Sequence, residues 1–74
     1  MSQKSIRYTL HARQRMSLRG ITERMVREAI EQPDRTGTGY CQRLLAWRAF
    51  PSGTLKVVYS DKPEPIVVIT TIWD

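Results

Sequence analysis

The spacing of the apolar residues changes near the middle of this 74-residue chain, and this change constrains the fold more than any other feature. Before Pro33 the apolar residues recur at the period of amphipathic helices. From Tyr40 onward they alternate or form short apolar runs, as they do in strands. A chain this short has only one small core, so the helices must pack on the sheet. We therefore predict a single α+β domain over residues 1–74.

Capping residues delimit two short helices in the first half of the chain. Thr9 is a suitable N-cap for the first helix, and Gly20 suits the left-handed position that ends it. Thr22 is a suitable N-cap for the second helix. Pro33 ends that helix at about Gln32, because proline cannot continue the helical hydrogen bonds. We expect two consecutive helices with a tight turn at Gly20 between them.

The second half predicts an antiparallel meander. Three segments have strand character, namely residues 40–50, 55–60 and 66–73. Residues 51–54 and 61–65 are short and contain proline, as turns between antiparallel strands often do. The polar, glycine-containing residues 34–39 are expected to form a connector, and residues 5–9 to add a fourth, edge strand. The expected fold is two N-terminal helices packed on one face of a three- to four-stranded antiparallel sheet, with Leu55, Val57 and Tyr59 facing the helices.

Composition narrows the class of protein. The net charge is +5, and the basic residues are concentrated in residues 1–48, where arginine predominates. This favours a polyanionic partner such as RNA or an acidic protein, although solubility alone also explains a basic surface. Cys41 is the only cysteine and His11 the only histidine, so we expect no disulfide, no metal and no cofactor. The sequence has neither a membrane-spanning stretch nor a signal peptide, so we expect a cytoplasmic protein with no membrane partner.

The strongest functional signal lies in the first predicted helix. His11, Arg15 and Arg19 fall on the same broad helical face as Ala12 and Met16. A potential base and two cations among apolar neighbours indicate a pocket. The helix N-terminus and Arg15 disfavour a protonated ring, so we expect His11 to act as a general base. Arg15 and Arg19 are suited to hold a phosphate, and attack by a ribose 2′-hydroxyl needs no metal.

A purely structural interpretation of the same residues stays open. In that interpretation, His11 hydrogen-bonds to a strand carbonyl, and the two arginines form ion pairs with Glu28 or Glu31. Nucleic-acid surfaces combine cations with aromatic rings, so further substrate contacts are expected elsewhere in the chain. The candidates for these contacts are Arg43, Lys56 and Tyr59. Tyr59 fits a place in the core better than it fits such a contact.

Three segments resemble those of a known family. They are Thr9-x-His11-Ala12-x-x-Arg15-Met16-x-x-Arg19-Gly20-Ile21-Thr22, then Leu55-Lys56-Val57-Val58-Tyr59, then Val67-Val68-Ile69-Thr70. In these segments the chain resembles the small bacterial domains of domain-of-unknown-function family 4258, which are similar to the RelE and ParE toxins. The resemblance implies a RelE-like fold and an RNA-cleaving or ribosome-directed toxin. It also implies a small antitoxin, either acidic or bearing a zinc finger, as the partner.

The resemblance also assigns roles to particular residues. His11 and Arg15 match the motif most closely, and Lys56 and Thr70 are weaker matches, with Thr70 a further candidate for substrate binding. The chain ends at Asp74, directly after the last predicted strand. We therefore expect a truncated RelE-like fold without the C-terminal catalytic element of the larger toxins.

Two functions of different classes remain. The first is a metal-independent endoribonuclease of the toxin–antitoxin kind, with His11 as base or acid and with Arg15 and Arg19 on the phosphate. The second is a non-catalytic module that binds RNA or an acidic protein through its sheet and its basic half. A third interpretation is an inert or degenerate toxin-like scaffold that forms a homodimer through an open sheet edge.

Overall fold

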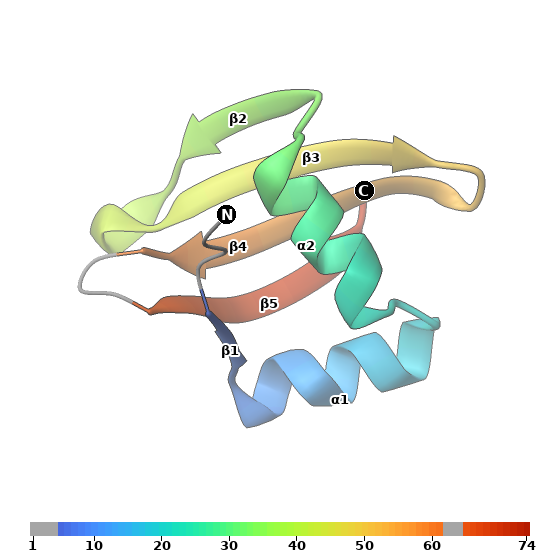
Figure 1. Ribbon diagram of the computed structural model, residues 1–74, viewed down its shortest axis with the longest axis horizontal. Coiled ribbons are helices and arrows are strands. Elements are labelled where there is room, and N and C mark those ends of the chain that lie inside the picture. Colours follow the sequence, from blue (N-terminus) through green and yellow to red (C-terminus); the bar gives the residue numbers. More distant parts are fainter. Residues whose placement is uncertain (1–4, 62–64) are drawn as a thin grey trace.

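Figure 1 shows the computed structural model of the chain, in which residues 5–61 and 65–74 are described. The helices are α1 (Leu10–Arg19) and α2 (Glu23–Glu31), and a 3-10 turn, η1, covers Tyr40–Gln42. The strands are β1 (Ile6–Tyr8), β2 (Arg35–Thr38), β3 (Leu44–Phe50), β4 (Gly53–Ser60) and β5 (Ile66–Trp73). The predicted α+β class is confirmed. Within the described residues, no helix is long and apolar enough to span a membrane.

The sheet differs from the predicted one in its number of strands and in their directions. Five strands lie in the order β1-β5-β4-β3-β2, and β1 runs parallel to β5, with Ile6 opposite Ile66. The other neighbouring strands are antiparallel. The prediction of three to four antiparallel strands is therefore wrong. The edge strand expected within residues 5–9 is present, but its direction depends on a partner at the far end of the chain. Alternation of apolar residues carries no information about that partner.

The strand β2 is the strand of the sheet that was not predicted. It lies in the segment 34–39 that was predicted to be a connector, and Gly37 is opposite Leu45 of β3. Main-chain hydrogen bonds to β3 hold such an edge strand without any apolar side chains of its own. Polar and glycine-rich composition therefore concealed a strand here.

The boundaries of two predicted strands also differ. The segment 40–50 becomes a strand only at Leu44, because η1 precedes it and Cys41 and Gln42 have left-handed φ values of 59° and 62°. The strand predicted over 55–60 begins earlier, at Gly53. The strand predicted over residues 66–73 is confirmed. Of the turn predicted over residues 61–65, residues 62–64 lie outside the described part.

The predicted helix caps are confirmed. The Thr9 hydroxyl oxygen accepts a hydrogen bond from the Ala12 N–H at 3.0 Å, and Gly20 ends α1 with φ 66° and ψ 31°. The Thr22 hydroxyl oxygen accepts a hydrogen bond from the Met25 N–H at 3.1 Å. These side chains satisfy N–H groups that have no partner within a helix. Local chemistry therefore sets both helix starts.

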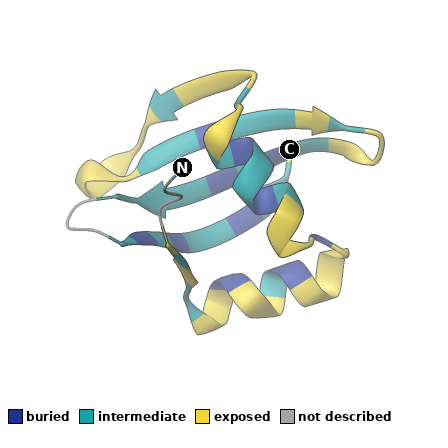
Figure 2. Cartoon of the chain, viewed as in Figure 1, coloured by how far each residue is buried: buried dark blue, intermediate teal, exposed yellow. Residues whose placement is uncertain are grey.

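Both helices pack against the sheet, and Figure 2 shows buried segments on both helices and on the strands β3, β4 and β5. The core consists of Ala12, Met16, Ile21, Val26, Ala29, Leu55, Val57 and Val68. The prediction that Leu55, Val57 and Tyr59 face the helices is confirmed. In Figure 1, α2 crosses the middle strands, whereas α1 runs beside β5. The second helix therefore covers the core, and the first closes one side of the sheet.

Candidate functional site

A cavity of about 350 Å³ lies between α1 and the second half of β5. We call it the α1–β5 cleft, and its lining consists of His11, Arg15, Arg19, Thr70, Thr71 and Ile72. The three helical residues are four positions apart, so their side chains follow one another along the same side of α1. The structure thus brings the predicted residues His11, Arg15, Arg19 and Thr70 into one site.

The short strand β1 creates the cleft by ending early. Its register with β5 runs only from Ile66 to Val68, so the remainder of β5 is a sheet edge. Thr9 then attaches the start of α1 to this strand, because its main-chain N–H donates to the Val68 carbonyl at 3.1 Å. The Thr9 hydroxyl also donates to the Ile69 carbonyl at 3.0 Å. The same residue therefore caps α1 and fixes its first turn, which carries His11, against β5.

A second attachment holds the other end of α1. The indole Nε1 of Trp73 donates to the main-chain carbonyl of Arg19 at 3.1 Å. This carbonyl belongs to the last turn of α1, where carbonyl groups have no partner within the helix. Both ends of α1 are therefore hydrogen-bonded to β5, and the cleft lies between these two attachments.

The buried stripe of α1 is narrower than expected. Ala12 and Met16 are buried, but Arg15 is only half-buried and His11 and Arg19 are exposed. The expectation that the histidine lies among apolar neighbours is therefore met only in part. A ten-residue helix beside a sheet edge contacts the core through a few small side chains, and the residues next to that stripe border solvent.

Among the described residues, the ion pairs leave the two cleft arginines without a carboxylate. The pairs are Arg13–Glu23, Arg24–Glu28, Arg27–Glu31 and Arg48–Glu28. Glu28 and Glu31, which the structural interpretation paired with Arg15 or Arg19, therefore bind other arginines. Within the part of the chain described, Arg15 and Arg19 have no acidic partner within 4.0 Å. The positive charge of the cleft is available to an anion.

The hydrogen bond to a strand carbonyl that the structural interpretation required of His11 is also absent. Over residues 5–61 and 65–74, the imidazole neither donates nor accepts a hydrogen bond. Both ring nitrogens therefore remain available to a ligand in the cleft.

Thr71 is a residue of the cleft that sequence reasoning missed. Its side chain faces the core, the residue is fully buried, and its hydroxyl finds no hydrogen-bond partner among the described residues. A threonine in a strand is ordinarily explained by its β-branched shape alone. The available signal was its register, because Thr71 lies opposite the buried Val57, where an apolar residue is expected.

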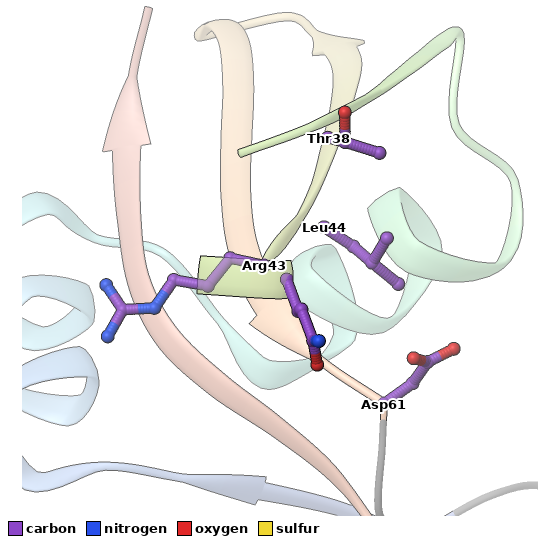
Figure 3. A pocket seen from close by; sticks show the side chains of 5 residues that line it. Thr38, Arg43, Leu44 and Asp61 are labelled. Atoms are coloured by element: carbon purple, nitrogen blue, oxygen red, sulfur yellow. The ribbon is translucent and has the colours of Figure 1, made fainter. Parts of the chain in front are cut away.

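Arg43 lies in a different cavity, of about 370 Å³, together with Thr38, Gln42, Leu44 and Asp61. Figure 3 shows that its guanidinium group points away from the Asp61 carboxylate. Arg43 follows η1 and precedes β3, which lies two strands away from β5 in the sheet. The structure therefore does not place Arg43 in the α1–β5 cleft.

Lys56 and Tyr59 also lie outside the cleft, and on opposite faces of β4. The Lys56 ammonium is on the face that α1 and α2 leave uncovered, 5.7 Å from the centre of the Trp47 ring. Tyr59 packs against the core. Burial raises the pKa of the Tyr59 phenol, and the negative charge of Asp61 raises it further. Because side chains alternate along a strand, these two residues cannot contact one ligand on the same face.

No group of three or more histidine, cysteine or acidic residues that could hold a metal ion is found in residues 5–61 and 65–74. The cleft instead combines an imidazole, two guanidinium groups and two threonines. Such a donor set suits an oxyanion. Its chemistry is that of phosphate or carboxylate recognition.

Comparison with known proteins adds a family. Residues 8–73 match the family described as Domain of unknown function (DUF4258). A comparison with curated proteins finds no match, and neither does a comparison with solved structures. The matched segment includes α1, α2 and nearly all of the sheet, and it contains every residue of the α1–β5 cleft. The chain therefore belongs to the DUF4258 family.

Proposed function

We propose that this protein is a metal-independent endoribonuclease with a RelE-like fold, and the toxin of a toxin–antitoxin pair. The observation that carries the proposal is the convergence of His11, Arg15 and Arg19 on one cleft against β5. When the nucleophile is the adjacent 2′-hydroxyl, a general base supplies the proton transfer of phosphodiester cleavage, and two guanidinium groups supply the charge stabilisation.

In the proposed reaction, the α1–β5 cleft holds the scissile phosphate. His11 accepts the proton of the ribose 2′-hydroxyl while the bond between O2′ and phosphorus forms. The bond between phosphorus and O5′ breaks, and His11 gives the proton that it accepted to the departing O5′. Arg15 and Arg19 neutralise the charge that accumulates on the phosphoryl oxygens. The products are a 2′,3′-cyclic phosphate and a 5′-hydroxyl end.

The likeness to RelE and ParE toxins is supported by the arrangement of the elements. Two helices precede the antiparallel meander of β3, β4 and β5, and both pack against it. A shared fold does not establish a shared activity, so the proposal depends on the residues of the α1–β5 cleft.

The direct test is cleavage of RNA by the purified protein in the presence of EDTA. We expect the wild type to cut and His11→Ala and Arg15→Ala to lose at least about 100-fold in rate, as is usual for a general base or an oxyanion-binding group. Arg24→Ala is the matched control. It removes the same charge from a side chain that is 89% exposed and whose pairing with Glu28 contributes little. Equal cleavage by the wild type and all three variants would remove the proposal.

Expression in bacteria gives a second readout of the same proposal. We expect induction of the wild-type chain to stop growth and His11→Ala to relieve the arrest. Co-expression of a small acidic or zinc-finger protein that forms a complex with the chain would identify the expected antitoxin. The net charge of +5 supports an acidic partner.

A non-catalytic RNA-binding module is the second candidate function. The observation in its favour is that His11 is exposed and, within the described residues, has no hydrogen-bond partner that would orient it. General bases are usually held by a second group. Binding of RNA by the wild type without turnover, unchanged in His11→Ala and weakened in Arg15→Ala, would favour this candidate.

A further inference from the structure

We infer that Thr71 forms the floor of a phosphate-binding site in the α1–β5 cleft, where its main-chain N–H and its hydroxyl both donate to phosphate oxygens. The inference deepens the proposed function by adding a residue that contacts the substrate. Phosphate binding, however, is measured without any cleavage. The two proposals therefore succeed or fail separately.

The first argument is the direction of the Thr71 main chain. The Asp74 N–H donates to the Thr54 carbonyl at 2.8 Å, so these two residues form a hydrogen-bonded pair across β4 and β5. Such pairs alternate with pairs that have no hydrogen bonds between them in an antiparallel ladder. Thr71 lies three positions before Asp74, so by this alternation Thr71 and its partner Val57 form a pair without hydrogen bonds between them. The N–H of Thr71 is therefore directed away from β4, toward the cleft.

The second argument is that, within residues 5–61 and 65–74, no other strand receives this N–H. The pairing of β1 with β5 ends at Tyr8, opposite Val68. Beyond that point the neighbour of β5 is α1, whose main-chain groups are largely used within the helix. Thr71 thus presents an N–H group at the bottom of a cavity whose upper walls carry Arg15 and Arg19.

The third argument is the Thr71 hydroxyl. Thr71 is fully buried, and its Oγ1 has no hydrogen-bond partner in the described part of the chain. Hydroxyl groups that are buried without a partner are rare in folded proteins, because they lose their bonds to water. A valine would fill the same volume without this penalty. A phosphate oxygen in the cleft supplies the missing acceptor.

Thr71 has no exposed surface, so a ligand reaches this floor only when the side chains over it change rotamer. Arg19 is exposed and Arg15 half-buried, and the side chains of such residues change rotamer within nanoseconds. Once their guanidinium groups turn toward a phosphate, each of them and Thr71 can contact a different oxygen. The phosphate then lies beside His11, as the proposed reaction requires.

The test is a titration of the isotope-labelled protein followed by NMR, with ionic strength held constant by chloride. One titration uses inorganic phosphate. A second uses a dinucleoside monophosphate with 2′-deoxyribose, which cannot be cleaved through a 2′-hydroxyl. Binding of the dinucleotide assigns the site to a phosphodiester, whereas binding of inorganic phosphate alone assigns it to a phosphate monoester. Each result supports a phosphate site provided that the amide signal of Thr71 shifts.

Thr71→Val is the decisive variant, because it keeps the shape and removes the hydroxyl. We expect it to bind the probe about tenfold more weakly, as expected for one lost hydrogen bond to a charged group, and to unfold at a higher temperature than the wild type. Thr71→Ser keeps the hydroxyl and should bind within about twofold of the wild type. Thr54→Val, a threonine of β4 outside the cleft, should leave binding unchanged.

Two outcomes overturn the inference. One is binding by the wild type that Thr71→Val does not weaken, and the other is the absence of any phosphate-dependent shift at Thr71. RNA cleavage that persists with either outcome leaves the endoribonuclease proposal standing. Conversely, phosphate binding that depends on the Thr71 hydroxyl stands even if no RNA is cut.

Discussion

At the scale of single residues, Tyr59 shows how burial links ionisation to stability. Burial, and then the Asp61 carboxylate, raise the pKa of its phenol above the ordinary value of 10.0. The unfolded chain therefore releases this proton at a lower pH than the folded chain does. The stability that Tyr59 contributes is complete below about pH 10 and is lost as the pH rises through the folded-state pKa.

We predict that Tyr59→Phe flattens the alkaline loss of stability. Between about pH 9 and about pH 11, the free energy of unfolding should fall less steeply in the variant than in the wild type, because one linked proton is gone. Urea unfolding at several pH values measures this slope. Tyr40→Phe is the control, since it removes the same hydroxyl from a residue that is 88% exposed. Parallel curves for the wild type and Tyr59→Phe would contradict the prediction.

Residue chemistry also explains which parts of the site could be predicted. His11, Arg15 and Arg19 have the spacing of one helical side, so their convergence followed from the sequence once the helix was placed. Lys56 and Tyr59 were grouped as substrate contacts although their alternation in a strand separates them. Thr71 was missed, because its register opposite the buried Val57 and its unpartnered hydroxyl are both properties of the folded chain and not of the residue.

At the scale of the elements, Thr9 contributes more than a helix cap. Its hydroxyl oxygen accepts from Ala12 at 3.0 Å and donates to the Ile69 carbonyl at 3.0 Å. Thr22 is the matched comparison, because its hydroxyl caps α2 without a second bond among the described residues. We predict that Thr9→Val lowers the free energy of unfolding by about 2 kcal/mol and Thr22→Val by about 1 kcal/mol.

The two variants should also differ in their effects on RNA cleavage and phosphate binding. Thr9→Val loosens the turn that holds His11 over β5, so RNA cleavage and phosphate binding should fall, whereas Thr22→Val should leave both unchanged. Denaturant unfolding and the cleavage assay, both made at a temperature where each variant is folded, provide the measurement. Equal losses in the two variants would show that Thr9 acts only as a cap.

The elements themselves could be predicted where local chemistry specifies them. Both helices, their caps and the strand over residues 66–73 follow from capping residues and apolar patterns. In contrast, β2 is held by β3, and β1 is held by a strand about 60 positions away. The left-handed backbone at Cys41 and Gln42 could not be predicted, because neither residue is a glycine. The sequence alone therefore does not show which strands pair when they are far apart in the chain.

At the scale of the whole molecule, the sheet offers two cationic regions to an anionic partner. One is the α1–β5 cleft at the sheet edge. The other is the face that α1 and α2 leave uncovered, where the Arg35 guanidinium lies 4.2 Å from the centre of the Trp47 ring and Lys56 approaches the same ring. A net charge of +5 attracts RNA to both regions, so affinity alone does not identify the binding region.

We predict that RNA occupies the α1–β5 cleft, and that the salt dependence of binding shows which of the two regions holds the RNA. Arg15→Ala and Arg35→Ala remove the same single charge, one from each region. Only Arg15→Ala should weaken the binding of an uncleavable 2′-O-methyl RNA and lower the slope of log affinity against log salt by about 1, the value for one lost phosphate contact. Fluorescence anisotropy at several salt concentrations measures both quantities. If Arg35→Ala lowers the slope and Arg15→Ala does not, RNA lies on the uncovered face of the sheet, away from the only histidine of the chain.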